Sequence, residues 1–188
     1  MHDSDAWISV STPYVKPREA GAPDAWAQEA ADHGRVGTQR LLHVGEVVPA
    51  PHIAAALHST PTDPVVVRRR LVLLDDQPVE LVDSYYPVDI ARGTRLADAR
   101  KIRGGAATLL AELGHELHHI DEDVSVRLSN ADETDLLALQ GASPVLLLMR
   151  TSSSRAGRPV EVSVMTMLPG RHLRYQLTTG HHDAPPSA

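Results

Sequence analysis

Residues 64–86 read PVVVRRRLVLLDDQPVELVDSYY, in which two apolar, β-branched-rich runs lie on either side of a polar tetrapeptide. Runs of this kind and length are typical of strands, and Asp75-Asp76-Gln77-Pro78 has the composition of a tight turn. The stretch therefore predicts a β-hairpin with strands at 64–74 and 79–86.

Four further runs have the same character and predict strands at 40–48, 117–128, 144–152 and 159–168, the last two joined by a turn at 154–157. Short helical patterns cover 24–31, 53–58, 106–113 and 133–139, and Gly34 and Gly114 are stop signals. Because hairpins dominate and strands do not alternate regularly with helices, we expect an α+β fold, a single domain with about six antiparallel strands and flanking helices.

Composition excludes several classes of protein. The chain has 188 residues with 42% apolar and 22% charged, as expected for one globular domain. No run approaches the roughly 18 apolar residues of a membrane span, and the first residues lack a secretory pattern, so we expect a cytoplasmic protein without membrane contact. The absence of Cys excludes disulfides and thiolate chemistry. A net charge of −6 argues against nucleic-acid binding by this chain alone.

Apolar patterning divides the chain into three parts. Residues 1–37 are rich in Pro, Gly, Ala and Asp and predict a lead-in with one short helix. Residues 38–177 hold all the predicted strands and form the compact domain. Residues 178–188 have no apolar spacing, which predicts a disordered tail.

Three consecutive arginines stand in the first strand of the predicted hairpin. Strand alternation places Arg68 and Arg70 on one face and Arg69 on the other. Two neighbouring guanidiniums favour an anion, although a solvated face with cross-strand ion pairs explains the same pattern. The partner strand presents Glu80, Val82, Ser84 and Tyr86 on one face and Leu81, Asp83 and Tyr85 on the other. Which set meets Arg70 depends on the register.

A basic, glycine-containing segment opens the helix predicted at 106–113. Lys101, Arg103, Gly104, Gly105 and Thr108 place cations and free backbone N–H groups at a helix N-terminus, which favours a bound phosphate or carboxylate. The alternative is a tight turn with solvated basic side chains.

The last predicted strand has two distinct faces. Val160, Val162, Val164 and Leu168 form an apolar stripe for the core, and the opposite face carries Glu161, Ser163, Met165 and Met167. Methionines beside polar groups are suited to an adaptable pocket wall, or else to a second small core beneath a covering helix.

The histidines do not form a metal motif. His115, His118 and His119 lack the spacing of a helical zinc site, so we expect no metal and no cofactor. Likewise, no serine-nucleophile motif stands out.

Together these segments resemble a known family. The Arg-rich strand, the DDQP turn, the DSYYP end at 83–87, Gly114 after a Leu-rich helix, Pro144-Val145-Leu146, Arg150 and GRPVE at 157–161 resemble the UTRA domain. UTRA is the effector-binding domain of GntR-type transcription regulators of the HutC subfamily. The resemblance covers about residues 38–177.

The resemblance implies a six-stranded antiparallel sheet similar to the chorismate lyase fold, a small and often anionic effector, and a homodimer. Arg70, Ser84 and Glu161 match polar positions of the family pattern. Val72, Val82 and Met167 stand where the family has Arg, Glu and Tyr, so a larger, more hydrophobic acid fits better than a sugar phosphate. The regulators also carry a winged helix-turn-helix domain, which nothing in residues 1–37 predicts.

Three functions are consistent with the sequence. The first is a sensor of a small organic acid, without its DNA-binding domain, whose predicted ligand-binding residues are Arg68, Arg70, Val82, Ser84, Tyr86, Lys101, Arg103, Gly104, Gly105, Thr108, Glu161, Ser163, Met165 and Met167. The second is a lyase, cyclase or isomerase acting on a carboxylate-bearing molecule, with Glu161 and Asp83 as acid and base. The third is an interaction module that dimerises through strand edges.

Overall fold

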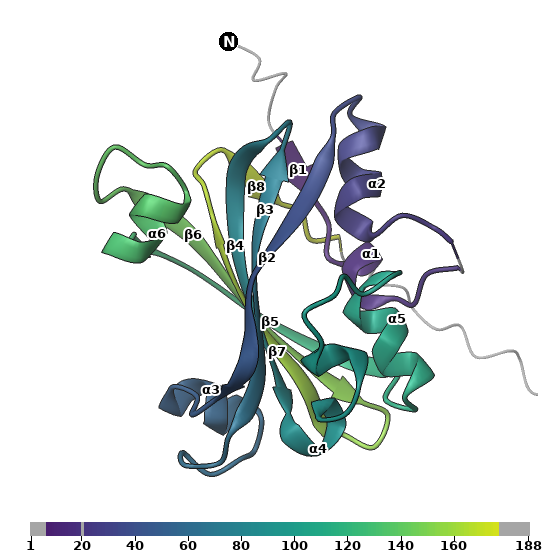
Figure 1. The fold of residues 1–188 in the computed structure, drawn as a ribbon. Helices are drawn as coiled ribbons and strands as arrows, with labels where there is room; N and C mark the ends of the chain where they lie inside the picture. The colour runs from purple at the N-terminus through teal and green to yellow at the C-terminus, as the bar shows by residue number, and fades with distance from the viewer. Residues whose placement is uncertain (1–6, 20, 177–188) are drawn as a thin grey trace, which may run out of the picture.

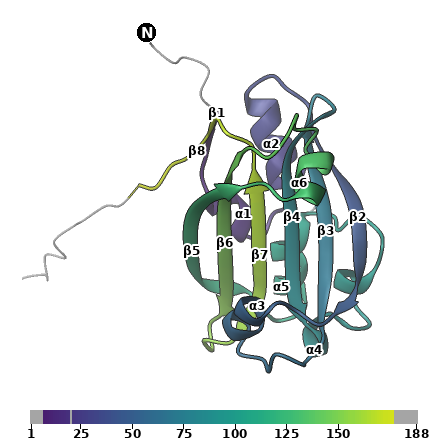
Figure 2. The same ribbon diagram turned by 90° about the vertical axis from the view of Figure 1, so that its left-hand side faces the viewer.

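A six-stranded antiparallel sheet forms the centre of the protein, whose computed structural model describes residues 7–19 and 21–176. The strands are β2 (Gly37–Val47), β3 (Val65–Leu74), β4 (Gln77–Pro87), β5 (Leu117–Leu128), β6 (Pro144–Ser154) and β7 (Pro159–Met167). Their order in the sheet is β2-β3-β4-β7-β6-β5, which Figure 2 shows nearly face-on. The expected α+β fold is confirmed, and each strand lies within a few residues of its predicted range. The tail predicted at 178–188 lies outside the described residues.

The two predicted hairpins are β3-β4 and β6-β7. At the first turn, Asp75 and Asp76 have φ angles of 46° and 63°. Two successive residues with positive φ are what a tight hairpin turn requires, and Asp tolerates this conformation. The turn residues read from the sequence therefore account for the connection.

The register of β3 against β4 decides which side chains meet. Arg70 lies opposite Val82, and Arg69 lies opposite Asp83. Directly opposite residues of an antiparallel pair share a face. Arg70 therefore lies on the face of Val82, and Asp83 is on the other face with Arg69.

Helices cover both faces of the sheet. They are α1 (Thr12–Val15), α2 (Ala25–Asp32), α3 (Pro51–Ala56), α4 (Val88–Ala91), α5 (Gly105–Glu112) and α6 (Ala131–Leu136), with a 3-10 turn, η1 (Arg95–Ala97). Figure 1 views the sheet close to edge-on, with α1, α2 and α5 on one side and α3 and α6 on the other. Among the described residues, no helix combines the length and the apolar character that crossing a membrane requires.

Three short elements, β1, α1 and β8, were not predicted from the sequence. β1 (Trp7–Ser9) pairs in parallel with β8 (Arg171–Leu173) as a separate two-stranded sheet, and α1 follows β1. Elements of three or four residues are too short to show a hydrophobic period. The described part of the lead-in, which was expected to hold one short helix, thus contains a strand and two helices.

The core on the α5 side is built around Leu110, which is 0% exposed. Leu110 packs in one cluster with Tyr86 of β4, Leu96 of η1 and Val160 of β7. Burial of apolar surface at this position therefore joins the helix to three other elements.

We expect Leu110→Ala to lower the free energy of unfolding by about 2–5 kcal/mol, because it removes buried methyl groups and leaves a cavity. Urea unfolding followed by circular dichroism measures the change. Leu113→Ala, at a residue 36% exposed at the end of the same helix, is the control and should cost less than half as much. Equal losses in the two variants would contradict this account of the core.

Candidate functional site

The candidate site is a cavity of about 130 Å³ between the sheet and the segment that precedes α2. Its floor comes from β3, β4, β6 and β7, and its roof from residues 9–18, with Trp26 of α2 and the start of α5 completing the wall. One water needs roughly 10–15 Å³ measured in the same way. The cavity is therefore large enough for a small organic molecule.

Many of the predicted ligand-binding residues meet in this cavity. Those that line it are Arg70, Val82, Gly104, Gly105, Glu161, Ser163, Met165 and Met167. Arg68, Tyr86 and Lys101 line a neighbouring cavity of about 100 Å³ that shares Arg70 and Gly105 with the first. The remaining predicted residues, Ser84, Arg103 and Thr108, line neither.

Arg70 is the central cation of the floor. Its Nη2 donates to Ser84 Oγ at 2.8 Å, and its Nη1 donates to Gln39 Oε1 at 3.2 Å. Ser84 Oγ also lies 2.8 Å from Ser163 Oγ. The Nε atom of Arg70 is buried without a hydrogen-bond partner, and within the described residues no carboxylate lies within 4.0 Å of the guanidinium. Arg70 therefore retains both charge and donors for an incoming anion.

Glu161 lies in the same wall and is 8% exposed. Its Oε1 accepts a hydrogen bond from Tyr86 Oη at 2.6 Å. Burial and the Glu161 carboxylate raise the pKa of Tyr86 well above its ordinary value. Tyr86 is thus a protonated donor that holds Glu161 in place at neutral pH.

The cavity wall is positive although the whole chain is negative. The lining contains five basic residues, Lys16, Arg18, Arg70, Arg150 and Arg171, and three acidic residues, Asp24, Glu80 and Glu161. The net charge of the chain is −6. An excess of cations in a recessed wall favours an anionic ligand.

Two of those cations are neutralised by carboxylates. Arg150 pairs with Glu122 at 2.6 Å, and Arg171 pairs with Glu80. Burial alone would raise the pKa of Glu122, but Arg150 and a hydrogen bond from Ser11 lower it. Burial raises the pKa of Glu80 against the opposing effect of Arg171.

The other lining cations have no such partner. Among the described side chains, Lys16, Arg18 and Arg70 have no carboxylate within 4.0 Å. Of the two other lining acids, Asp24 is paired with Lys101 at 2.9 Å, and Glu161 accepts a hydrogen bond from Tyr86. The unpaired charges of the wall are therefore mostly positive.

The apolar part of the wall is formed by the methionine face of β7. Met165 and Met167 are 8% and 2% exposed and pack with Val82, Leu148 and Trp26. Both interpretations of the sequence hold here, because α2 covers a small core whose inner surface is also pocket wall. The indole of Trp26 is fixed by donating from Nε1 to the Leu73 carbonyl at 2.9 Å.

Arg68 differs from Arg70 although both lie on one face. It is 4% exposed, and its guanidinium donates to the backbone carbonyls of Arg95, Leu96, Asp98 and Arg100. These bonds use its donors to hold the loop around η1. The structure thus separates two arginines that strand alternation alone treats as equivalent.

At the corner formed by Gly104 and Gly105 the cavity is lined by backbone atoms, and the nearby basic side chains Lys101 and Arg103 do not line it. Thr108 Oγ1 donates to the Gly104 carbonyl at 2.8 Å and accepts from the backbone N–H of Arg18 at 3.0 Å. Arg103 is exposed. The corner therefore connects α5 to the roof segment.

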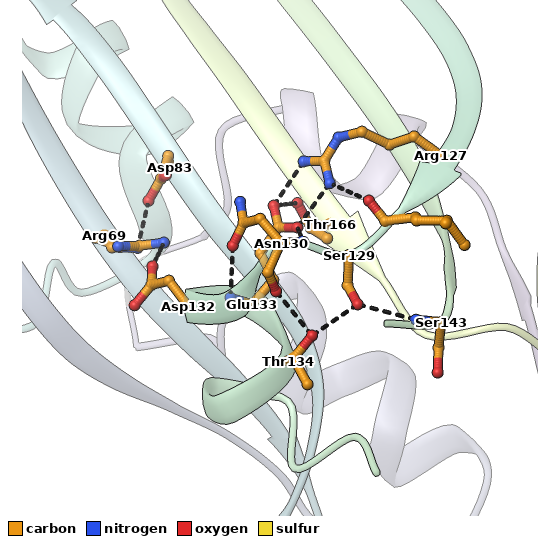
Figure 3. A network of polar contacts seen from close by, with 11 residues as sticks. Arg69, Asp83, Arg127, Ser129, Asn130, Asp132, Glu133, Thr134, Ser143 and Thr166 are labelled. Carbon is orange, nitrogen blue, oxygen red and sulfur yellow. Dashed lines mark hydrogen bonds and ion pairs between the residues drawn. The ribbon is translucent and has the colours of Figure 1, made fainter. Parts of the chain in front are cut away.

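Asp83 lies on the opposite face, in the polar network of Figure 3. Arg69 joins Asp83 at 3.3 Å and Asp132 of α6 at 2.6 Å. Burial raises the pKa of Asp83. Because Glu161 lines the cavity on the other side of the sheet, the two carboxylates suggested as an acid and base pair do not face one substrate.

Part of the cavity lining was not predicted from the sequence. It consists of the roof at residues 9–18, of Trp26 and Gln39, and of the two cations Arg150 and Arg171. Their elements are either very short or distant in sequence from the hairpin. Among the described residues, no three His, Asp or Glu side chains are placed to hold a metal ion.

Comparisons with known proteins agree with this architecture. The UTRA domain pattern matches residues 32–172. An HTH-type transcriptional regulator from Streptomyces coelicolor is 32% identical over 124 residues, which cover 64% of this chain and 46% of that protein. Another from Mycobacterium tuberculosis is 27% identical over 162 residues, or 79% of this chain and 59% of that protein. The chain thus spans about half the length of the curated relatives it matches.

Solved structures show the same fold. The ligand-binding domain of a protein assigned to the GntR-family transcriptional regulators, from Bordetella bronchiseptica, has a TM-score of 0.67 at 23% identity, covering 86% of this chain and 94% of that one. The effector domain of PhnF from Mycobacterium smegmatis has a TM-score of 0.68 at 17% identity, covering 88% and 99%.

The polar network between the sheet and α6 predicts that the free energy of unfolding depends on pH. Arg127 donates two hydrogen bonds to Glu133, at 2.7 and 2.6 Å, and lowers the pKa of that carboxyl. A lowered folded-state pKa contributes stability above the unfolded value, about 4.3, which is lost as the pH falls through the folded value. Arg127→Met should therefore reduce the free energy of unfolding by about 1–3 kcal/mol at pH 7, where it leaves a buried carboxylate unpaired.

We expect this loss to shrink as the pH falls below about 4.3 and through the lowered pKa of Glu133, measured by urea unfolding at several pH values. Arg92→Met, which breaks an exposed pair with Glu46, is the control and should have little effect at any of them. A loss that stays constant with pH would refute the role assigned to Glu133.

Proposed function

This chain belongs to the UTRA domain family, and we propose that it is the effector-sensing domain of a GntR-type transcription regulator whose effector is a small organic acid. The observation that carries the choice of ligand is Arg70, a half-buried guanidinium in a cavity, with a buried Nε that lacks a partner and no carboxylate nearby. Taking a cation out of water without a counterion is costly, so an anion at this position stabilises the fold as well as the complex.

The polar contacts define how an acid group is held. One oxygen accepts from the free donors of Arg70, and the Ser163 hydroxyl lies beside it in the same wall. The remainder of the ligand lies against Val82, Met165 and Met167, which are apolar and buried. The effector is therefore an acid with an apolar portion.

Sensing requires that the acid favour one of two arrangements of the regulator. Regulation then depends on a DNA-binding domain joined to or associated with this one, and the cytoplasm is the compartment in which it acts. As part of the same proposal, we assign the chain to the HutC subfamily of the GntR family. An enzyme is the weaker alternative because Asp83 and Glu161 lie on opposite faces of the sheet.

Native mass spectrometry with a panel of monocarboxylates, dicarboxylates, aromatic acids and sugar phosphates tests the proposal. A partly apolar acid should bind with a one-to-one mass and remain unchanged over hours. Binding by none of the acids, or consumption of the compound, would overturn the sensor assignment.

Arg70→Gln should raise the dissociation constant of the bound acid at least about tenfold, because it removes a charge-assisted hydrogen bond. Arg69→Gln is the matched control, since Arg69 is the next residue on the same strand and faces away from the cavity. Calorimetric titration of both variants, each checked by circular dichroism, measures the difference. Equal affinity of Arg70→Gln and the wild type would remove Arg70 from the site.

We also propose that the domain forms a homodimer through the free edge of β5. Val124, Val126 and Leu128 alternate along this edge strand and are 47%, 66% and 62% exposed. The opposite edge, β2, is interrupted by a bulge at Leu41/His43 and lies beside α2. The register shift of β5 lies at Leu117/His119, and the strand is paired continuously from His119 to Leu128. An apolar edge of this kind is a template for strand pairing.

The sequence of β5 is complementary to itself. In an antiparallel pairing centred on Ser125, Val124 lies opposite Val126 of the partner subunit, and Asp123 lies opposite Arg127 of the partner subunit. Apolar pairs at facing positions stabilise antiparallel strands. Arg127 is already paired with Glu133 of its own chain, so the valine pairs carry this argument. This symmetry supports a second copy of the chain as the occupant.

Val126→Asp should convert the dimer to a monomer, because two buried carboxylates would face the partner's Val124 across the pairing. Size-exclusion chromatography with light scattering measures the mass. Val48→Asp is the control, since Val48 is also 66% exposed but follows β2. A wild-type monomer, or a Val126→Asp dimer, would exclude this interface.

A further inference from the structure

The roof of the cavity comes from a segment that the family pattern does not include. The UTRA match begins at residue 32, whereas Ser9, Ser11, Tyr14, Lys16 and Arg18 all line the cavity. We refer to residues 7–18 as the strap. The strap therefore adds contacts from outside the residues that match the family pattern.

The strap is firmly attached as far as Tyr14. A single carboxylate, Glu29 of α2, accepts hydrogen bonds from Trp7 Nε1 at 2.5 Å, Ser9 Oγ at 2.6 Å and Tyr14 Oη at 2.7 Å. β1 is also paired with β8. These bonds place the start of the strap independently of any ligand.

The end of the strap, residues 15–18, has fewer attachments. Its backbone is held by the bond from Arg18 N–H to Thr108. The Arg18 side chain lines the cavity, its Nε is buried without a hydrogen-bond partner, and among the described residues no carboxylate lies within 4.0 Å of it. Arg18 on the roof therefore resembles Arg70 on the floor, because each has a buried Nε without a hydrogen-bond partner and no carboxylate nearby.

We propose that the effector carries two anionic groups, one bound by Arg70 on the sheet and the other by Arg18 on the strap, so that binding fastens the strap over the cavity. This rests on the proposed function and specifies its ligand class as a dicarboxylate, or another dianion, with a short apolar spacer. Each half-buried guanidinium gains a charge-assisted partner. The spacer lies against Met165 and Met167.

The test compares adipate with hexanoate, which have chains of equal length with two carboxylates and one. Wild-type protein should bind adipate at least about tenfold more tightly, the gain from one further charged hydrogen bond. Arg18→Gln should reduce adipate binding to about the level of hexanoate and should weaken hexanoate binding much less. Arg18→Lys should retain part of the preference, and Arg40→Gln, exposed on β2 and outside the cavity, should retain all of it.

Hydrogen exchange of residues 7–18 provides a second readout, which a merely structural role of Arg18 would not change. Adipate should slow exchange of these amides in the wild type and not in Arg18→Gln, with equal melting temperatures showing that both are folded. If the two acids bind the wild type equally and Arg18→Gln alters neither, the clamp is refuted while acid sensing stands. If neither acid binds the wild type, both the clamp and the acid ligand are refuted.

Discussion

The pleat of β3 places its three consecutive arginines in three different environments. Because successive side chains of a strand point to opposite faces, Arg69 is directed to α6 and its neighbours to the cavity side. Arg68 binds the carbonyls of the loop around η1, and Arg70 remains available in the cavity wall. A shift of one residue in the register would exchange these faces and remove the site, so the ligand-binding surface depends on the pairing of β3 with β4.

Much of the fold could be predicted from the sequence, and the site only in part. Long apolar runs and turn residues give the strands and hairpins because those signals are local. The different states of Arg68 and Arg70 are set by carbonyls about thirty residues away in sequence, which no local pattern contains. The strap was missed for a related reason, since its elements are too short for periodicity and are held by side chains of α2 and α5.

The charge of the cavity wall is set by which side chains form ion pairs, and not by the net charge of the chain. A chain with a net charge of −6 has a positive cavity because two of the three lining acids, Asp24 and Glu80, are paired with cations, while Arg18 and Arg70 are left without a carboxylate. Net charge bears on long-range attraction, and local pairing on what a cavity accepts. The overall acidity and the anionic ligand are therefore compatible.

The position of the two tryptophans gives the domain an intrinsic optical reporter. The chain has two Trp and no Phe, and the rings of Trp7 and Trp26 lie 5.4 Å apart where the strap meets α2. Arg171 lies 4.8 Å from the ring centre of Trp26, and His33 stacks on Trp7 at 4.3 Å. Indole emission from this protein therefore originates entirely where the strap meets α2, beside the cavity, and its wavelength and quenching report the solvation of that region without any attached dye.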